Sequence, residues 1–201
     1  MISAIVLAAG ASSRMGQAKA ALPLGQTGET VVARVVRTLL EGGVPNVVVV
    51  AGAHIDAVRA AMPRHESRAR VIEHLGWAQG QLSSLLAGLD AIDDPLLEAA
   101  VVTLVDVPLV RPSTVQSLIA RASVSASPIL RAVHGGRHGH PVIFKREVFG
   151  ALRAADPAVG AKAVMRAIGV EDIEVDDPGI LQDVDTPEDY TSLLTRIAPN
   201  P

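Results

Sequence analysis

The chain has 201 residues, of which 49% are hydrophobic and only 2% aromatic, and its formal net charge is −3 at pH 7. We therefore expect one domain with an aliphatic core, and the negative charge gives no electrostatic basis for nucleic-acid binding. Because there is no cysteine, disulfides and thiolate chemistry are excluded. No apolar run reaches the roughly 18 residues of a membrane span, and the N-terminus is typical of a strand rather than a signal peptide, so we expect a cytoplasmic protein.

A strand predicted at Ser3–Leu7 runs into a loop made of small residues. The stretch "VLAAGASSRMGQAKAALPL" has no large side chain from Ala8 to Ser13, and its only charges are Arg14 and Lys19. Small side chains let a ligand approach the backbone, where free N–H groups can hold anions. The spacing matches neither the dinucleotide fingerprint nor the P-loop. The loop is therefore either a phosphate cradle with two cations or an ordinary turn with solvated charges.

Helical and strand patterns alternate after this loop, which is typical of βαβ units and predicts a mostly parallel sheet flanked by helices. Apolar residues at helical spacing predict helices at Glu29–Glu41 and Gln81–Ile92, and Pro followed by Ser, a helix-start signal, predicts one at Pro112–Ala122. Continuous apolar runs, typical of strands that are covered on both faces, predict strands at Val47–Ala51, Arg70–Glu73, Ala100–Val105 and Val142–Phe144. The stretch Arg131–Gly139 is predicted to be a mobile loop.

Two carboxylates from distant parts of the chain are candidates for a shared Mg²⁺ site. Asp106 follows the strand predicted at Ala100–Val105, where a carboxylate points into the ligand crevice of an α/β sheet or caps a loop. Asp183 and Asp185 share one side of an extended segment. Thr186 then predicts a helix N-cap, which leaves Asp185 free to join Asp106 around Mg²⁺, a cation that favours oxygen ligands.

Other polar residues leave their roles open. Gly80, Ser83 and Ser84 stand at the start of the helix predicted at Gln81–Ile92, where the hydroxyls either cap the helix or meet a ribose. His138 and His140 have zinc-like spacing but no suitable third ligand. His140 is expected to face a substrate pocket or to cap a strand.

The motif "LAAGASSRMGQAK" resembles the signature L-A-[AG]-G-x-S-x-R-M-G-x-x-K of the MobA-like NTP transferases of the molybdenum cofactor group. The similarity continues, in the family's order, through "WAQGQLSSLLAGL", "LVDVPLV", "GHPVIF" and "DVDTPEDY". It implies a single-domain, Rossmann-like nucleotide-diphospho-sugar transferase fold over residues 1–201. The N-terminal part would bind the nucleotide, and residues from about 110 to 185 would form the acceptor side.

The Ala8-Ala9-Gly10 version of the motif is similar to the cytidylyltransferase branch more than to the guanylyltransferase branch, which usually has L-A-G-G. The resemblance thus implies transfer of CMP from CTP to molybdopterin cofactor, a phosphorylated pterin, with release of pyrophosphate, and a molybdoenzyme as client. The same reaction with GTP, or with a sugar phosphate or phospholactate as acceptor, stays open. So does a non-catalytic carrier that hands a cofactor to an apo-enzyme.

The resemblance also implies roles for individual positions. The residues that would meet the nucleotide are Leu7, Ala8, Ala9, Gly10, Gly80, Ser83 and Ser84. The catalytic set would comprise Arg14 and Lys19, which neutralise phosphates, and Asp106 and Asp185, which hold Mg²⁺. Gly139 and His140 would line the acceptor side. The chain departs from the family at Val105, where the family usually has Gly, and at Lys162, where it has Arg.

Overall fold

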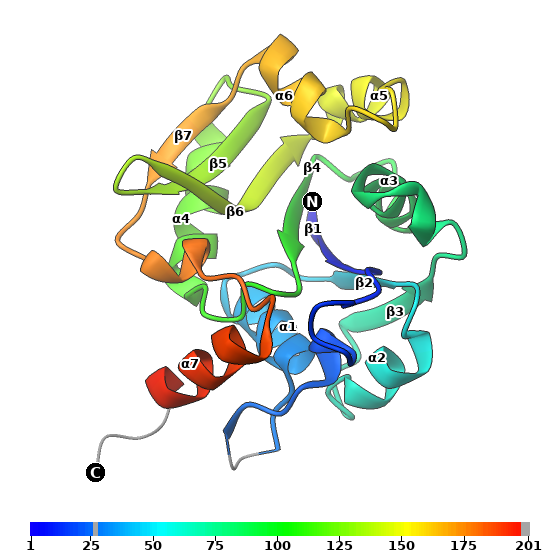
Figure 1. Cartoon of the computed structure of the whole chain (residues 1–201). Coiled ribbons are helices and arrows are strands. Elements are labelled where there is room, and N and C mark those ends of the chain that lie inside the picture. Colours follow the sequence, from blue (N-terminus) through cyan, green and yellow to red (C-terminus); the bar gives the residue numbers. More distant parts are fainter. Residues whose placement is uncertain (26–27, 198–201) are drawn as a thin grey trace.

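The computed structural model describes residues 1–25 and 28–197, which form one α/β domain around a seven-stranded sheet (Figure 1). The strand order is β3-β2-β1-β4-β6-β5-β7, and the only antiparallel pairs in the described sheet are those of β6 with β4 and β5. The strands are β1 (Ile2–Ala8), β2 (Val47–Ala51), β3 (Ala69–Glu73), β4 (Ala99–Leu104), β5 (Ile129–His134), β6 (Arg137–Lys145) and β7 (Glu171–Glu174). The predicted fold class is confirmed, while positions 26–27 and 198–201 of the predicted domain lie outside the described residues.

Helices cover both faces of the sheet and enclose two aliphatic cores. One core includes residues of α1 (Val31–Glu41), α2 (Ile55–Ala61), α4 (Pro112–Val124) and α7 (Pro187–Ile197). The other includes residues of α3 (Gln81–Ala91), α5 (Arg146–Arg153) and α6 (Ala161–Ile168). Along β1, Ala4 and Val6 enter the first core and Ile5 enters the second. This two-sided burial explains why the strands are apolar along their whole length.

The hairpin of β5 and β6 corrects one expectation. The predicted mobile loop at Arg131–Gly139 is wrong, because these residues continue β5, turn at Gly135-Gly136 and enter β6. Both glycines have positive φ, +56° and +74°, as a two-residue hairpin turn of type I′ requires. Arg131 Nη2 lies 2.8 Å from Asp172 Oδ1 on β7, so its charge is paired across the sheet.

Thr30 fixes the start of α1. Its Oγ1 accepts a hydrogen bond from Ala33 N at 3.2 Å and donates one to Ala61 O at 2.7 Å, at the end of α2. This is an N-cap, so α1 begins at Val31, two residues later than the predicted start at Glu29.

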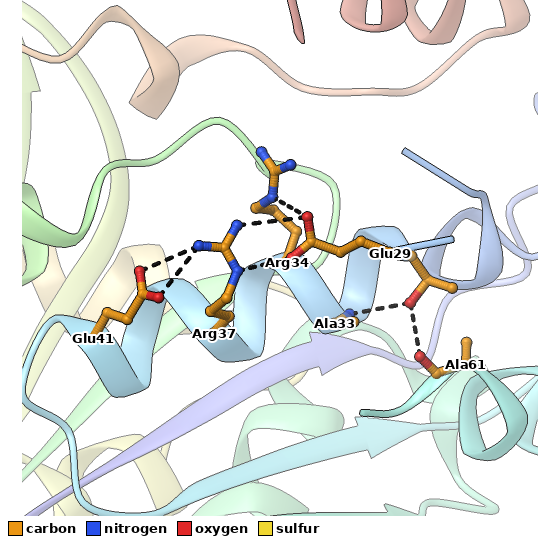
Figure 2. Close-up of polar contacts among 7 residues, drawn as sticks. Glu29, Ala33, Arg34, Arg37, Glu41 and Ala61 are labelled. Atoms are coloured by element: carbon orange, nitrogen blue, oxygen red, sulfur yellow. Dashed lines mark hydrogen bonds and ion pairs between the residues drawn. The ribbon is translucent and has the colours of Figure 1, made fainter. Parts of the chain in front are cut away.

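Glu29 clamps the segment before α1 against the helix surface (Figure 2). Its carboxylate accepts from Arg34 Nε at 2.6 Å and from Arg37 Nε at 2.8 Å. Nearby, Val31 N donates to Leu22 O at 2.9 Å. These contacts fix the chain just after the short 3-10 helix η1 (Lys19–Ala21), which carries Lys19.

The order of strands brings two distant loops together. β1 pairs in parallel with β2 on one side and with β4 on the other, so the connections leave the sheet in opposite directions at β1 and β4. In open α/β sheets, ligands bind outside the strand carboxyl ends at such a switch point. Val105 N donates to Leu7 O at 3.1 Å, which aligns the ends of β4 and β1.

The segment between β7 and α7 is anchored by the buried carboxylate of Asp177, which is 2% exposed. Its Oδ2 accepts from Arg111 N at 2.8 Å and from Thr114 Oγ1 at 2.6 Å, and its Oδ1 accepts from Gly179 N at 3.0 Å. A side chain at Gly179, on the 3-10 helix η4 (Pro178–Leu181), would collide with the Leu109 carbonyl oxygen. The segment is therefore packed tightly against the start of α4.

The same segment then reaches the end of β4. Val184 N donates to Asp106 O at 2.8 Å, which holds Asp185 beside Asp106. Asp189 N donates to Thr186 Oγ1 at 3.2 Å, and Thr186 N donates to Asp189 Oδ2 at 2.8 Å. This reciprocal capping box confirms the predicted helix start at Pro187.

We expect Asp177→Ala to lower the free energy of unfolding by about 3 kcal/mol, because it leaves buried donors on α4 and η4 without an acceptor. Urea denaturation measures the change. Asp176→Ala, at an exposed neighbouring position, serves as control and should have an effect within about 0.5 kcal/mol of zero. An equal loss in the two variants would contradict the anchoring role of Asp177.

Candidate functional site

A cavity of about 400 Å³ opens at the carboxyl ends of β1 and β4. Its walls come from the loop after β1, the end of β4, α2, the start of α3 and the 3-10 helix η3 (Trp77–Gln79). Most of the predicted site residues line it, namely Leu7, Ala8, Ala9, Gly10, Arg14, Lys19, Gly80, Ser84 and Asp106. Thus one cavity collects residues that are up to about one hundred positions apart in the chain.

The loop after β1 presents its backbone to this cavity. Ser12, which has a φ of +50°, accepts hydrogen bonds at its carbonyl from Met15 N at 2.9 Å and from Gly16 N at 3.1 Å. Within residues 1–25 and 28–197, the backbone N–H groups of residues 10–14 donate no hydrogen bond to another group of the protein. Neighbouring N–H groups without a partner in the protein can donate hydrogen bonds to a bound anion.

Two contacts from the end of β2 fix the loop in place. Ala53 N donates to Ala9 O at 3.2 Å, and His54 Nε2 donates to Ala11 O at 2.8 Å. His54 also lines the cavity. Consequently the loop conformation depends on residues that the sequence motif does not contain.

Lys19 lies between the two predicted metal carboxylates. Its Nζ forms a close ion pair with Asp185 and is 3.6 Å from Asp106 Oδ2, and its side chain is only 13% exposed. Arg14 Nη2 approaches the other oxygen of Asp185 at 2.7 Å, from a side chain that is 68% exposed. In this arrangement the cations and carboxylates neutralise one another.

The two carboxylates differ in their electrostatic environment. Burial raises the pKa of Asp106; Lys19 opposes this effect, while Asp183 and Asp185 add to it. The hydrogen bond from Lys19 lowers the pKa of Asp185, with a further contribution from Arg14. The surroundings of Asp106 thus disfavour its charged form, whereas those of Asp185 favour it.

The residues fit a divalent cation. Asp106 Oδ1 is buried without a hydrogen-bond partner, as expected of an oxygen reserved for a ligand. No group of three or more His, Cys, Asp and Glu residues in the described parts of the chain could hold a metal. A cation between Asp106 and Asp185 would therefore rely on substrate oxygens and water for its remaining ligands, as Mg²⁺ commonly does.

Four predicted residues do not line the cavity: Asp185, which is ion-paired with Lys19 and Arg14, and Ser83, Gly139 and His140. Ser83 Oγ, at the start of α3, donates a hydrogen bond to Gly80 O at 2.8 Å and lies 3.0 Å from His74 Nε2. These contacts join the start of α3 to the turn before it. Gly139 and His140 lie on β6 instead. A side chain at Gly139 would collide with the Ile180 carbonyl oxygen, so glycine there permits close packing of η4 on β6.

His140 nevertheless belongs to the surroundings of the carboxylates. Its Nδ1 is buried without a hydrogen-bond partner, and burial lowers the pKa of its imidazole. Asp183 opposes that shift and Lys162 reinforces it, so both charges lie within electrostatic reach of the ring. Since Asp183 also acts on Asp106, it connects the region around His140 to the cavity.

Sequence reasoning missed several residues of the cavity wall, among them His54, Val58, Trp77 and Gln81. His54 and Val58 carry no local signal, because α2 was not predicted. Trp77 had a local signal, since it is the only tryptophan of the chain and opens the quoted motif "WAQGQLSSLLAGL".

No helix in the described residues is long and apolar enough to span a membrane.

Residues 4–173 match the family model of the MobA-like NTP transferase domain. The nicotine blue oxidoreductase of Paenarthrobacter nicotinovorans is 33% identical over 96% of each chain. The molybdenum cofactor cytidylyltransferase of Escherichia coli is 26% identical over 97% of this chain and 96% of that one. A probable molybdenum cofactor guanylyltransferase of Mycolicibacterium paratuberculosis is 27% identical over 96% of this chain and 94% of that one.

A similar fold is found in the crystal structure of Rv0371c from Mycobacterium tuberculosis. That structure has a TM-score of 0.82 and 30% identity, covering 97% of this chain and 98% of the other. A second structure of Rv0371c, a complex with manganese, has a TM-score of 0.75 and 29% identity, covering 98% and 99%.

We expect Lys19→Met to bind Mn²⁺ more tightly than the wild-type chain does when no nucleotide is present, by about threefold or more. The ammonium group competes with a cation for the same carboxylates, and its removal strengthens their field. The same variant should bind inorganic tripolyphosphate more weakly, since the positive charge of Lys19 no longer attracts the phosphates. Calorimetric titration measures both affinities.

Arg166→Met, which removes an exposed cation from α6, is the control and should change neither affinity. Weaker Mn²⁺ binding by Lys19→Met would contradict the competition between Lys19 and the metal.

Proposed function

Since the chain belongs to the MobA-like NTP transferase family, we propose that it transfers CMP from CTP to a phosphorylated acceptor, with molybdopterin cofactor as the favoured acceptor. Nucleotidyl transfer follows from the family. CTP and the pterin rest on the likeness of the first motif to the cytidylyltransferase branch, and relatives named for molybdenum cofactor cytidylyl and guanylyl transfer support the pterin. The cytidylyl and guanylyl relatives are 26% and 27% identical to this chain, so sequence identity does not distinguish CTP from GTP as the substrate.

The observation that carries this proposal is the charge layout of the cavity. A loop with unpaired N–H groups, two cations and two carboxylates meet at one sheet edge. A triphosphate needs such a combination, because its negative charge must be held and its leaving group stabilised. A site for a neutral ligand would gain little from it.

The reaction needs positioning and charge stabilisation more than proton transfer. An anionic oxygen of the acceptor phosphate attacks the α-phosphorus, a new P–O bond forms, and the bond to the β-phosphate oxygen breaks as pyrophosphate leaves. Lys19 and Arg14 exchange their pairing with Asp185 for contacts to the phosphates. A divalent cation at Asp106 and Asp185 would supply further neutralisation of the α-phosphate and the pyrophosphate. For Rv0371c, a manganese complex is known.

The preference for cytosine is attributed to Ala9. Its Cβ restricts the turn after β1, whereas a second glycine, as in L-A-G-G, would free the backbone and admit a larger purine. Ala9 is 5% exposed and lines the cavity, so its side chain occupies space at the wall. The cytosine edge would then be matched by backbone donors and acceptors of the same loop.

The acceptor is assigned to the side formed by residues from about 110 to 185. Lys162 and Asp183 act electrostatically on His140 there, and Asp183 also acts on Asp106. Lys162 takes the place of the family's Arg as the cation for the acceptor phosphate. A non-catalytic carrier remains the rival function, and it is disfavoured because binding alone does not require a pair of carboxylates around a cation.

We expect pyrophosphate release with CTP, Mg²⁺ and molybdopterin, and a kcat/KM for CTP at least about tenfold higher than for GTP, a difference of ~1.4 kcal/mol in activation free energy. A coupled pyrophosphate assay with the four nucleoside triphosphates and a panel of phosphorylated acceptors tests this. Equal turnover with GTP would remove the cytidylyl assignment. Nucleotide binding without pyrophosphate release from any acceptor would favour the carrier.

Removal of single carboxylates should separate their roles. Asp106→Ala should abolish activity and Asp185→Ala should reduce it strongly, on the order of ~3–4 kcal/mol in activation free energy. Asp183→Ala should be milder, since Asp183 is exposed and is not ion-paired with Lys19 in the described structure. If Asp183→Ala is inactive while Asp185→Ala is active, Asp183 is the second metal ligand instead.

A further inference from the structure

The cavity has one wall that phosphate chemistry does not explain. In the strand order β3-β2-β1-β4, Asp106 follows β4 and Trp77 follows β3, so the two lie on opposite sides of the loop after β1. Beside Trp77, the lining includes His54, Val58 and Ala78. The cavity therefore has a charged side, with Lys19 and Asp106, and an aromatic and apolar side.

Trp77 rests on the backbone of Gly52. A Cβ atom at Gly52 would lie 2.5 Å from Trp77 Cγ and 2.6 Å from Trp77 Cβ, so only glycine leaves room for the indole ring. The turn that carries Trp77 is held by His74, whose N donates to Ala51 O at 2.8 Å and whose carbonyl accepts from Trp77 N at 3.3 Å. The ring is thus seated at a defined place between the end of β2 and the cavity.

Core packing does not account for Trp77. The core of this chain is aliphatic, and its two phenylalanines are buried inside it, at 3% and 4% exposure. Tyr190 lies on α7 and donates its hydroxyl proton to Pro23 O at 2.5 Å. Trp77 is only partly buried, and among the Phe, Tyr and Trp side chains of the described residues it is the one that lines the cavity.

We propose that the Trp77 indole is the surface on which the nucleobase of the substrate stacks. This inference rests on the proposed function, because it requires a nucleotide in the cavity. Flat bases stack on aromatic side chains with little dependence on base identity, since every base has a π-face. Trp77 therefore contributes affinity for CTP and GTP alike, while the backbone of the loop at Ala8–Gly10 distinguishes between them.

Trp77 is the only tryptophan of the chain, so intrinsic tryptophan fluorescence reports on this side chain alone. The full chain is titrated in Mg²⁺ with CTP, with GTP and with inorganic tripolyphosphate. We expect both nucleotides to quench the emission. Tripolyphosphate should compete with CTP but leave the emission unchanged, because it occupies only the charged side of the cavity.

Calorimetry on variants provides the second measurement. Trp77→Leu should bind CTP and GTP about tenfold more weakly, within the range of base–aromatic stacking, and should keep its affinity for tripolyphosphate. Gly52→Ala keeps the tryptophan but displaces it, and should weaken nucleotide binding in the same way. Leu75→Ala is the control, since Leu75 is 85% exposed and does not line the cavity. Thermal melting followed by circular dichroism identifies any variant that fails to fold.

The possible outcomes separate this inference from the proposed function. If CTP binds the wild-type chain but neither quenches Trp77 nor loses affinity in Trp77→Leu, stacking is refuted and nucleotide binding stands. Equal losses for CTP and tripolyphosphate in Trp77→Leu also overturn the inference, because they show that Trp77 only shapes the loop. If neither nucleotide nor tripolyphosphate binds, both the inference and the proposed function fail.

Discussion

The ammonium group of Lys19 holds together three segments of the chain that are far apart in sequence. It lies between Asp106 at the end of β4 and Asp185 before α7, and the loop after β1 leads into the short helix that carries it. Partly buried carboxylates so close together would repel one another without a cation. The cluster therefore requires either Lys19 or a substitute for it. Under the proposed function, this requirement couples the binding of a metal to the binding of phosphates, since a metal that displaces Lys19 would leave its charge available to the substrate.

Contacts elsewhere in the fold hold the three segments of this cluster in place. Parallel pairing of β1 with β4 aligns their carboxyl ends, and the hydrogen bond from Val184 N to Asp106 O brings in the third segment. Asp177 anchors that segment upstream, and the capping box at Thr186 fixes it downstream. Each anchor is a buried or reciprocal hydrogen-bond arrangement, so a shift of the segment would leave polar groups unsatisfied.

The cavity combines this charged side with an aromatic side, and the two have different physical tasks. Ion pairs and backbone N–H groups suit phosphates, whose charge does not depend on the base of a nucleoside triphosphate. An indole ring seated on Gly52 suits a flat base, again with little discrimination. Under the proposed function, selectivity is left to the loop between them, where Ala9 lines the cavity.

Local pattern was sufficient for much of the fold and part of the site. Continuous apolar runs predicted five strands, and small residues after the first strand, with Asp106 after the fourth, indicated the loop and carboxylate that line the cavity. The hairpin at Arg131–Gly139 was mispredicted because it is held by the pairing of β5 with β6 and β7, which sequence spacing does not contain. The cavity wall likewise contains His54 and Trp77, which come from segments far from the first motif. The ion pair of Lys19 with Asp185 also joins two distant segments. Burial and periodicity are local properties that a sequence displays, whereas the meeting of side chains depends on strand order, which only the tertiary structure decides.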